Sequence, residues 1–251
     1  MFEQTLCGRA GLLLGLFLMP GFLLAEDIPR DQHPWGRHAP GSWTRVKVTT
    51  EKISAAGNKS TAVALVTTRL LAVDEHGVTL QTETRLGKDI TKGPAITTNW
   101  DGTQRDGNRS ERLSLGEVKF KGRSHSCQTH SVTRTIGDRT VSTKSWYSPD
   151  TSPYYLKRLI RVRGPQPRHT AIDVVTLNAT RQIDNKKYTG WETRTVIANR
   201  GGRSRSVSFH TFQVPGGLIQ SEGERHDVDN ARAGRRLVEL DAFHAVPVSS
   251  K

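Results

Sequence analysis

Residues 125–130 hold the densest group of side chains that could do chemistry, because two histidines flank a cysteine there. On a strand, His125 and Cys127 share one face while His130 points to the other, so the three do not converge. His125 and Cys127 could seat copper or zinc only if His169 or His210 approached from a neighbouring strand. We therefore predict a buried cysteine and no metal site, with His125 and Cys127 as the residues to check for one.

Asp101, Asp106 and Glu111 form a second group, made of carboxylates. They could bind Ca²⁺ or act as an acid–base pair, but the regular Asp and Gly spacing of a calcium loop is missing, and we interpret them as part of a solvated loop. The sequence also has no Gly-x-Ser-x-Gly motif and no glycine-rich phosphate loop. We expect no enzyme activity and no cofactor.

Positive charge is the next signal, since 37 Lys and Arg against 24 Asp and Glu give a formal net charge of +13. Such a field attracts anionic lipid headgroups or acidic glycans and allows peripheral contact with a membrane. The candidate ligand-binding residues are Arg158, Arg161 and Arg163, with Trp100 and Trp146. The alternative is that the basic side chains only solvate the outer face of a sheet and protect its edges.

Nucleic acid is not an expected partner. The chain shows no recognition helix, and the aromatic residues beside its basic runs are too few for a stacking platform.

The elements that must position these residues are strands. Short runs of alternating apolar and polar residues, separated by Gly, Pro and Asn turns, predict an all-β fold with a large antiparallel meander, either curled as a half-barrel or packed as two layers. Eleven strands are predicted, at residues 42–54, 61–74, 78–86, 124–136, 140–148, 154–163, 170–180, 188–198, 204–214, 218–225 and 235–243. They form a single domain over residues 42–251.

Two segments lack this alternation. Residues 87–114 are predicted to form a long loop, which is either a functional flap or a disordered segment, and Trp100 lies within it. Residues 26–41 contain three prolines and read as an extended N-terminal arm that leads into the first strand.

Residues 1–25 have the build of a signal peptide: a head with one basic residue, an apolar core, and a small residue, Ala25, where cleavage occurs. The alternative is an uncleaved N-terminal anchor. Cleavage would remove Cys7 and leave Cys127 alone, so that no internal disulfide could form. We expect export to the periplasm, the cell surface or the medium.

Two short motifs resemble those of a known group of bacterial proteins. The stretch His33-Pro-Trp-Gly-Arg-His-Ala-Pro-Gly-Ser-Trp43, and later Trp146-Tyr147-Ser148 before a proline-bounded turn, resemble exported planctomycete-type bacterial proteins of unknown function. A leader followed by a long meander is also similar, at the level of fold, to the periplasmic lipoprotein carriers, whose half-barrel sheet holds acyl chains. Neither resemblance carries over a functional residue.

The favoured hypothesis is a non-catalytic envelope protein that binds an anionic or lipidic ligand on its curved sheet. A structural module that assembles through sheet edges or Cys127 is the first alternative. The second is a hydrolase or metal-dependent enzyme that uses the 87–114 loop or the face of His125 and Cys127.

Overall fold

The computed structural model describes residues 28–54, 56–105, 108–120, 122–148, 151–183 and 185–248. The predicted signal peptide lies outside these residues. The protein is all-β, with 73% of the described residues in strands. In the described part the helical structure is a 3-10 helix of three residues, η1 (Arg30–Gln32), and no helix there is long and apolar enough to cross a membrane.

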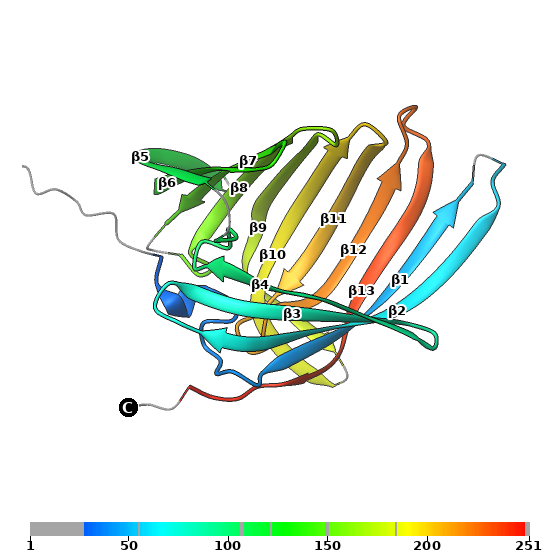
Figure 1. Ribbon diagram of the computed structural model, residues 1–251, viewed down its shortest axis with the longest axis horizontal. Coiled ribbons are helices and arrows are strands. Elements are labelled where there is room, and N and C mark those ends of the chain that lie inside the picture. The colour runs from blue at the N-terminus through cyan, green and yellow to red at the C-terminus, as the bar shows by residue number, and fades with distance from the viewer. Residues whose placement is uncertain are drawn as a thin grey trace, which may run out of the picture.

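Thirteen strands of the described chain form one antiparallel sheet. They are β1 (Trp43–Ile53), β2 (Lys59–Val73), β3 (Gly77–Leu86), β4 (Asp89–Asn99), β5 (Asn108–Phe120), β6 (Arg123–Ile136), β7 (Arg139–Tyr147), β8 (Tyr155–Arg163), β9 (Arg168–Ile183), β10 (Lys186–Asn199), β11 (Gly202–His210), β12 (Leu218–His226) and β13 (Arg232–His244). Consecutive strands pair, except that β4 and β5 stay apart and β1 pairs with β13 (Figure 1). The sheet therefore has its free edges at β4 and β5.

The all-β prediction and its eleven strands are confirmed, but the predicted loop at 87–114 is wrong. Most of it forms β4 and the first half of β5. These are the two edge strands, and both are largely exposed on both faces. Because the prediction relied on one buried and one solvated face, it could not detect a strand without a buried face.

The sheet curls around a hollow instead of forming two layers, and it is not closed into a barrel (Figure 1). Leu80 of β3 and Thr98 of β4 line the same cavity as Tyr147 of β7 and Arg158 of β8. Strands far apart in the sheet thus face each other, and alternate residues of each strand point into the hollow or away from it.

Burial differs between the two ends of the strands. At one end, here called the open end, lie the hairpin turns that join β1–β2, β6–β7, β8–β9, β10–β11 and β12–β13. Strands reaching it become exposed, as the first five residues of β2 and the end of β8 show. The other end, here called the packed end, holds buried residues such as Leu70, Val78 and Tyr147.

The N-terminal segment closes the packed end. It was predicted to be an extended arm, but its described part forms η1 and a series of turns. The reason is packing: Trp35 is buried in a cluster with Leu70, Val78 and Trp100. Gly216 lies beneath it with φ +78°, and a Cβ there would come within 2.8 Å of the Trp35 ring. Glycine is therefore required at this contact.

Candidate functional site

The hollow contains two neighbouring cavities. The first has a volume of about 290 Å³, lies toward the packed end and is mainly aromatic. Its walls include Trp35, Trp100, Tyr147, Tyr154 and Tyr155, which come from the N-terminal segment, the turn after β4 and the β7–β8 region.

The second cavity has a volume of about 330 Å³ and lies toward the open end. Its apolar wall consists of Val132 of β6, Val141 of β7, and Ile160 and Val162 of β8. Arg134 of β6 and Arg168 of β9 also line it. The arrangement combines an aliphatic surface with positive charge, which suits a ligand that has an apolar part and an anionic part.

Arg158 lines both cavities. Its Nε donates to Ser145 Oγ at 3.0 Å, and its Nη2 donates to the backbone oxygen of Asp101 at 2.7 Å and to Tyr147 Oη at 3.3 Å. The guanidinium also lies over the Tyr155 ring, 5.0 Å from its centroid. All three acceptors are neutral oxygens, so these bonds orient the guanidinium, and the nearby carboxylate of Asp101 acts on it through charge without such a bond.

The groups around Arg158 keep its guanidinium protonated. Burial alone would lower the pKa of Arg158, but the neighbouring Tyr147, Tyr155 and Asp101 raise it above its usual value. Beside it, burial and the positive charge of Arg158 lower the pKa of His33 to about 4, against an opposing effect of Asp101. His33 is therefore neutral at physiological pH, and Arg158 is the cation among the described residues that line the aromatic cavity.

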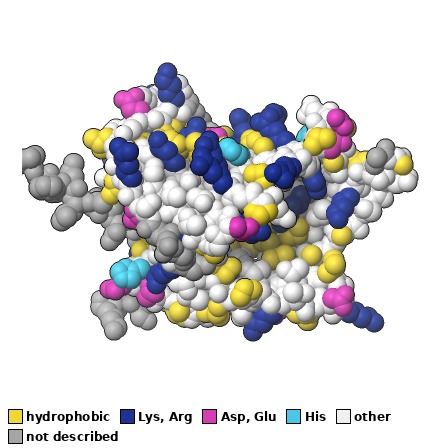
Figure 2. All heavy atoms as spheres, turned by 45° about the horizontal axis from the view of Figure 1, so that its top comes forward, with side chains coloured by type: hydrophobic (Ala, Val, Ile, Leu, Met, Phe, Trp, Pro, Cys, Tyr) yellow, Lys and Arg dark blue, Asp and Glu magenta, His cyan; other side chains and the backbone are white. Residues whose placement is uncertain are grey.

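Figure 2 shows Lys and Arg side chains gathered over the upper part of the molecule and hydrophobic side chains inside the recess. This pattern agrees with the lining of the second cavity, where Arg134, Arg158 and Arg168 accompany valine and isoleucine.

The structure separates the predicted ligand-binding residues into two groups. Arg158 and Trp100 line the hollow. Arg161 and Arg163 are exposed and alternate with the inward-facing Ile160 and Val162, so they lie on the outer face. Trp146 also lies outside, between the ammonium groups of Lys144 and Lys157 at 4.9 and 5.8 Å from its ring.

The prediction that Cys127 is buried is confirmed. Cys127 is a buried free thiol, and burial raises its pKa. His210 does not approach it as a metal ligand, because His210 stacks on Trp191 and contacts Thr193 Oγ1 at 3.1 Å. His169 lies on β9, exposed and beside Arg161.

A different group converges: Asp101, Glu111 and His130 each offer an atom within 4.8 Å of the others. His130 Nδ1 lies 3.7 Å from Asp101 Oδ2, and His130 Nε2 lies 3.6 Å from Glu111 Oε2. The ring therefore faces two carboxylates with two different nitrogens. Because an imidazole binds a metal through one nitrogen, this is the geometry of a charged cluster more than of a metal centre. Asp106 lies outside the described residues.

Comparison with known proteins identifies no relative. No family model, curated protein or solved structure matches the chain. The function must therefore be argued from the site itself.

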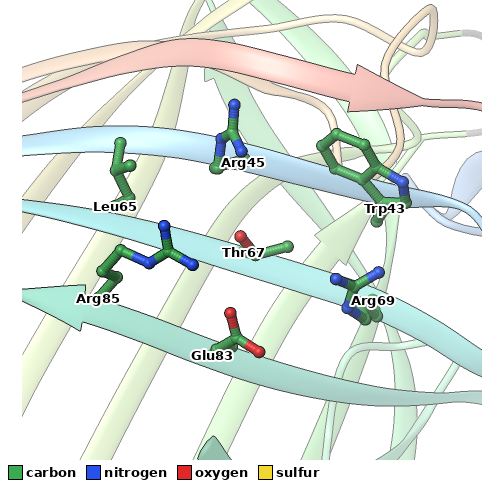
Figure 3. A pocket seen from close by; sticks show the side chains of 7 residues that line it. All are labelled: Trp43, Arg45, Leu65, Thr67, Arg69, Glu83 and Arg85. Atoms are coloured by element: carbon green, nitrogen blue, oxygen red, sulfur yellow. The ribbon is translucent and has the colours of Figure 1, made fainter. Parts of the chain in front are cut away.

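A third pocket, of about 150 Å³, lies on the outer face of β1–β3 (Figure 3). Arg45, Arg69 and Arg85 surround Thr67, with Trp43 at one end (Figure 3). Its charge is partly cancelled: Arg45 Nε lies 2.5 Å from Asp241 Oδ2, and Glu83 is part of the lining. The hollow is therefore the stronger candidate for an anion.

Sequence reasoning missed Tyr147, Tyr154, Tyr155 and Arg134 as parts of the site. For Arg134 a signal existed, because Arg134 pairs with Val141 across β6 and β7 and Val141 faces the same side. Counting alternate residues along paired strands would have placed it in the hollow. Tyr147 ends β7, Tyr154 lies in the turn before β8 and Tyr155 begins β8, so all three lie where strand alternation is interrupted.

Proposed function

We propose that this protein is an exported, non-catalytic binding protein that holds an anionic amphiphile in the hollow of its sheet. The ligand has an acidic head, which meets Arg158, and an aliphatic part, which lies along Val132, Val141, Ile160 and Val162. The single observation that carries the proposal is the half-buried guanidinium of Arg158, whose hydrogen bonds within the described part of the chain go only to neutral oxygens.

The charge of Arg158 supports an anionic head. Partial burial makes a cation without a hydrogen-bonded anion costly, and a carboxylate or phosphate oxygen is the partner that a guanidinium binds best. Arg134 and Arg168 in the same cavity extend the positive field toward the open end. A neutral ligand would offer no negative charge to these guanidinium groups.

The lining supports an apolar tail. Four branched aliphatic side chains face the second cavity, and none of the described residues that line it is Asp or Glu. The volume of each cavity, about 290 and 330 Å³, lies near the lower end of the range for small-molecule sites. Export is part of the proposal and rests on the composition of residues 1–25.

The test is a titration of the purified protein with a fluorescent long-chain fatty acid and with the alcohol of the same chain. We expect saturable binding of the acid and much weaker binding of the alcohol. Arg158→Gln should weaken binding of the acid roughly 30-fold or more, which corresponds to about 2 kcal/mol.

Arg161→Gln is the matched control, because it removes the same charge from the outer face of the same strand. Equal binding of acid and alcohol would overturn the role of Arg158. Absence of binding to either would overturn the amphiphile proposal.

A further inference from the structure

The two free edges of the sheet are built differently. On β4, Pro94 removes one backbone donor, and residues 103–105 fold back on the last part of the strand. Arg105 N donates to Thr97 O at 3.1 Å, and Asn99 N donates to Thr103 O at 2.8 Å. Proline and a covering segment are the usual means of protecting an edge.

β5 has neither protection. It runs for 13 residues without a proline, and it pairs along its whole length with β6. In the described part of the chain β6 is its one hydrogen-bonded neighbour, so its other side presents a row of backbone donors and acceptors. Such an edge is a template for another strand.

The side chains of β5 also point to a partner. Residues 110–115 are all exposed, although they belong to a strand in a sheet. Leu115 is 78% exposed, the largest fraction for any large hydrophobic side chain in the described residues, and Leu113 is 44% exposed. Both leucines lie on the same face, two residues apart.

We infer that β5 pairs with β5 of a second copy of this chain, antiparallel and about a two-fold axis at Leu115. A two-fold axis between antiparallel strands is perpendicular to the sheet and keeps each face on its own side. Residues directly opposite each other must therefore both have odd or both have even numbers, which leaves few registers.

Charge distinguishes the register at Leu115 from its neighbour at Ser114. With Leu115 opposite Leu115 of the second copy, Glu111 lies opposite Lys119 of the second copy, and the symmetry makes this pair twice. Moving the axis to Ser114 would place Glu111 opposite Glu117, which is destabilising. The register at Leu115 also makes the two Leu113 side chains diagonal neighbours of the leucine pair. The dimer would join two sheets edge to edge, with both hollows on the same side.

Cysteine cross-linking tests the register. Opposite residues in antiparallel strands have Cα atoms about 4.5–5.5 Å apart, which suits a disulfide. Under mild oxidation, Leu115→Cys should therefore form a covalent dimer in most chains. Ser114→Cys, one residue from the axis, should cross-link much less. The parent protein, in which Cys127 is buried, is the control.

Sedimentation of the unmodified protein tests the association itself. We expect a concentration-dependent dimer, which Leu115→Lys weakens roughly tenfold or more. Leu86→Lys, which changes another exposed leucine (52%), should leave it intact. A monomer at every concentration, or equal cross-linking at positions 114 and 115, would overturn the inference. Leu115→Lys should keep its fatty-acid binding, so this result is separate from the test of the hollow.

Discussion

The packed and open ends of the hollow are made by the same strands but use their inward-facing residues differently. At the packed end, Trp35, Leu70 and Val78 fill the interior and are at most 6% exposed. At the open end, Ile160 and Val162 face the hollow and remain partly exposed. The packed end is thus a hydrophobic core, whereas the inward-facing residues of the open end line a cavity. Stability should depend mainly on the first, and ligand binding on the second.

The largest expected effect is on stability at the packed end. Trp35→Ala should lower the free energy of unfolding by about 3–5 kcal/mol, because it leaves a cavity among Leu70, Val78 and Trp100. Ile136→Ala at the open end, where the side chain is 39% exposed, should cost under about 1 kcal/mol. Urea unfolding measures both. Similar losses of unfolding free energy for the two variants would contradict the claim that the packed end contributes more to stability than the open end.

The next effect is a pH dependence that arises from two half-buried histidines, His33 and His210. Burial, with Arg158 for His33, lowers the pKa of His33 and His210 to about 4. The unfolded chain binds these protons near pH 6.5, so stability should be complete above that pH and fall as the pH drops toward 4, by on the order of 3 kcal/mol for each histidine.

Unfolding curves of His33→Gln and His210→Gln between pH 7 and pH 4 should show a smaller loss than the parent protein. His169→Gln, at the exposed start of β9, is the control, and it should lose as much stability between pH 7 and pH 4 as the parent protein does. If the free energy of unfolding fell with pH as steeply in all three variants as in the parent protein, these histidines would not be the cause of the pH dependence.

Ligand affinity should respond at the open end. Ile160→Asp places a carboxylate on the wall beside Arg158 and should reduce fatty-acid affinity roughly tenfold or more, by repulsion of the anionic head and loss of apolar contact. Leu159→Asp makes the same change one residue away on the outer face, where Leu159 is 38% exposed. Titration should show nearly unchanged affinity for Leu159→Asp. Equal losses would contradict the assigned faces of β8.

The smallest effect concerns the outer arginines. Exchanging both Arg161 and Arg163 for Gln should leave fatty-acid affinity within about twofold, because neither faces the hollow, while reducing salt-sensitive association with anionic vesicles. Vesicle co-sedimentation at two salt concentrations measures this. A large loss of fatty-acid affinity would move the binding site to the outer face.

Most of the fold could be predicted from the sequence, because interior strands have one buried face and alternate accordingly. β4 and β5 were missed because an edge strand exposed on both faces does not alternate. The sequence left a curled sheet and two packed layers as alternatives, and the pairing of β1 with β13 could not be predicted, since pairing between distant strands leaves no local pattern.

The site was only partly predictable. Arg158 was selected from its charge. Arg161 and Arg163 were grouped with it, although alternate residues of a strand face opposite sides and both arginines are an odd number of residues from Arg158. Asp101, Glu111 and His130 were assigned to two unrelated groups, and the structure brings them together because β5 pairs with β6. Their contact depends on a strand that was interpreted as a loop.

The position of β1 in the sheet has a consequence for how the chain folds. β1 lies between β2, its neighbour in sequence, and β13, the last strand, and Ser42 Oγ accepts a hydrogen bond from Val246 N across 204 residues. Closing so long a loop is entropically slow, and the sheet cannot be completed until the final strand is available. A chain with this topology stays unfinished during synthesis, the state in which a polypeptide can still be threaded through a narrow channel.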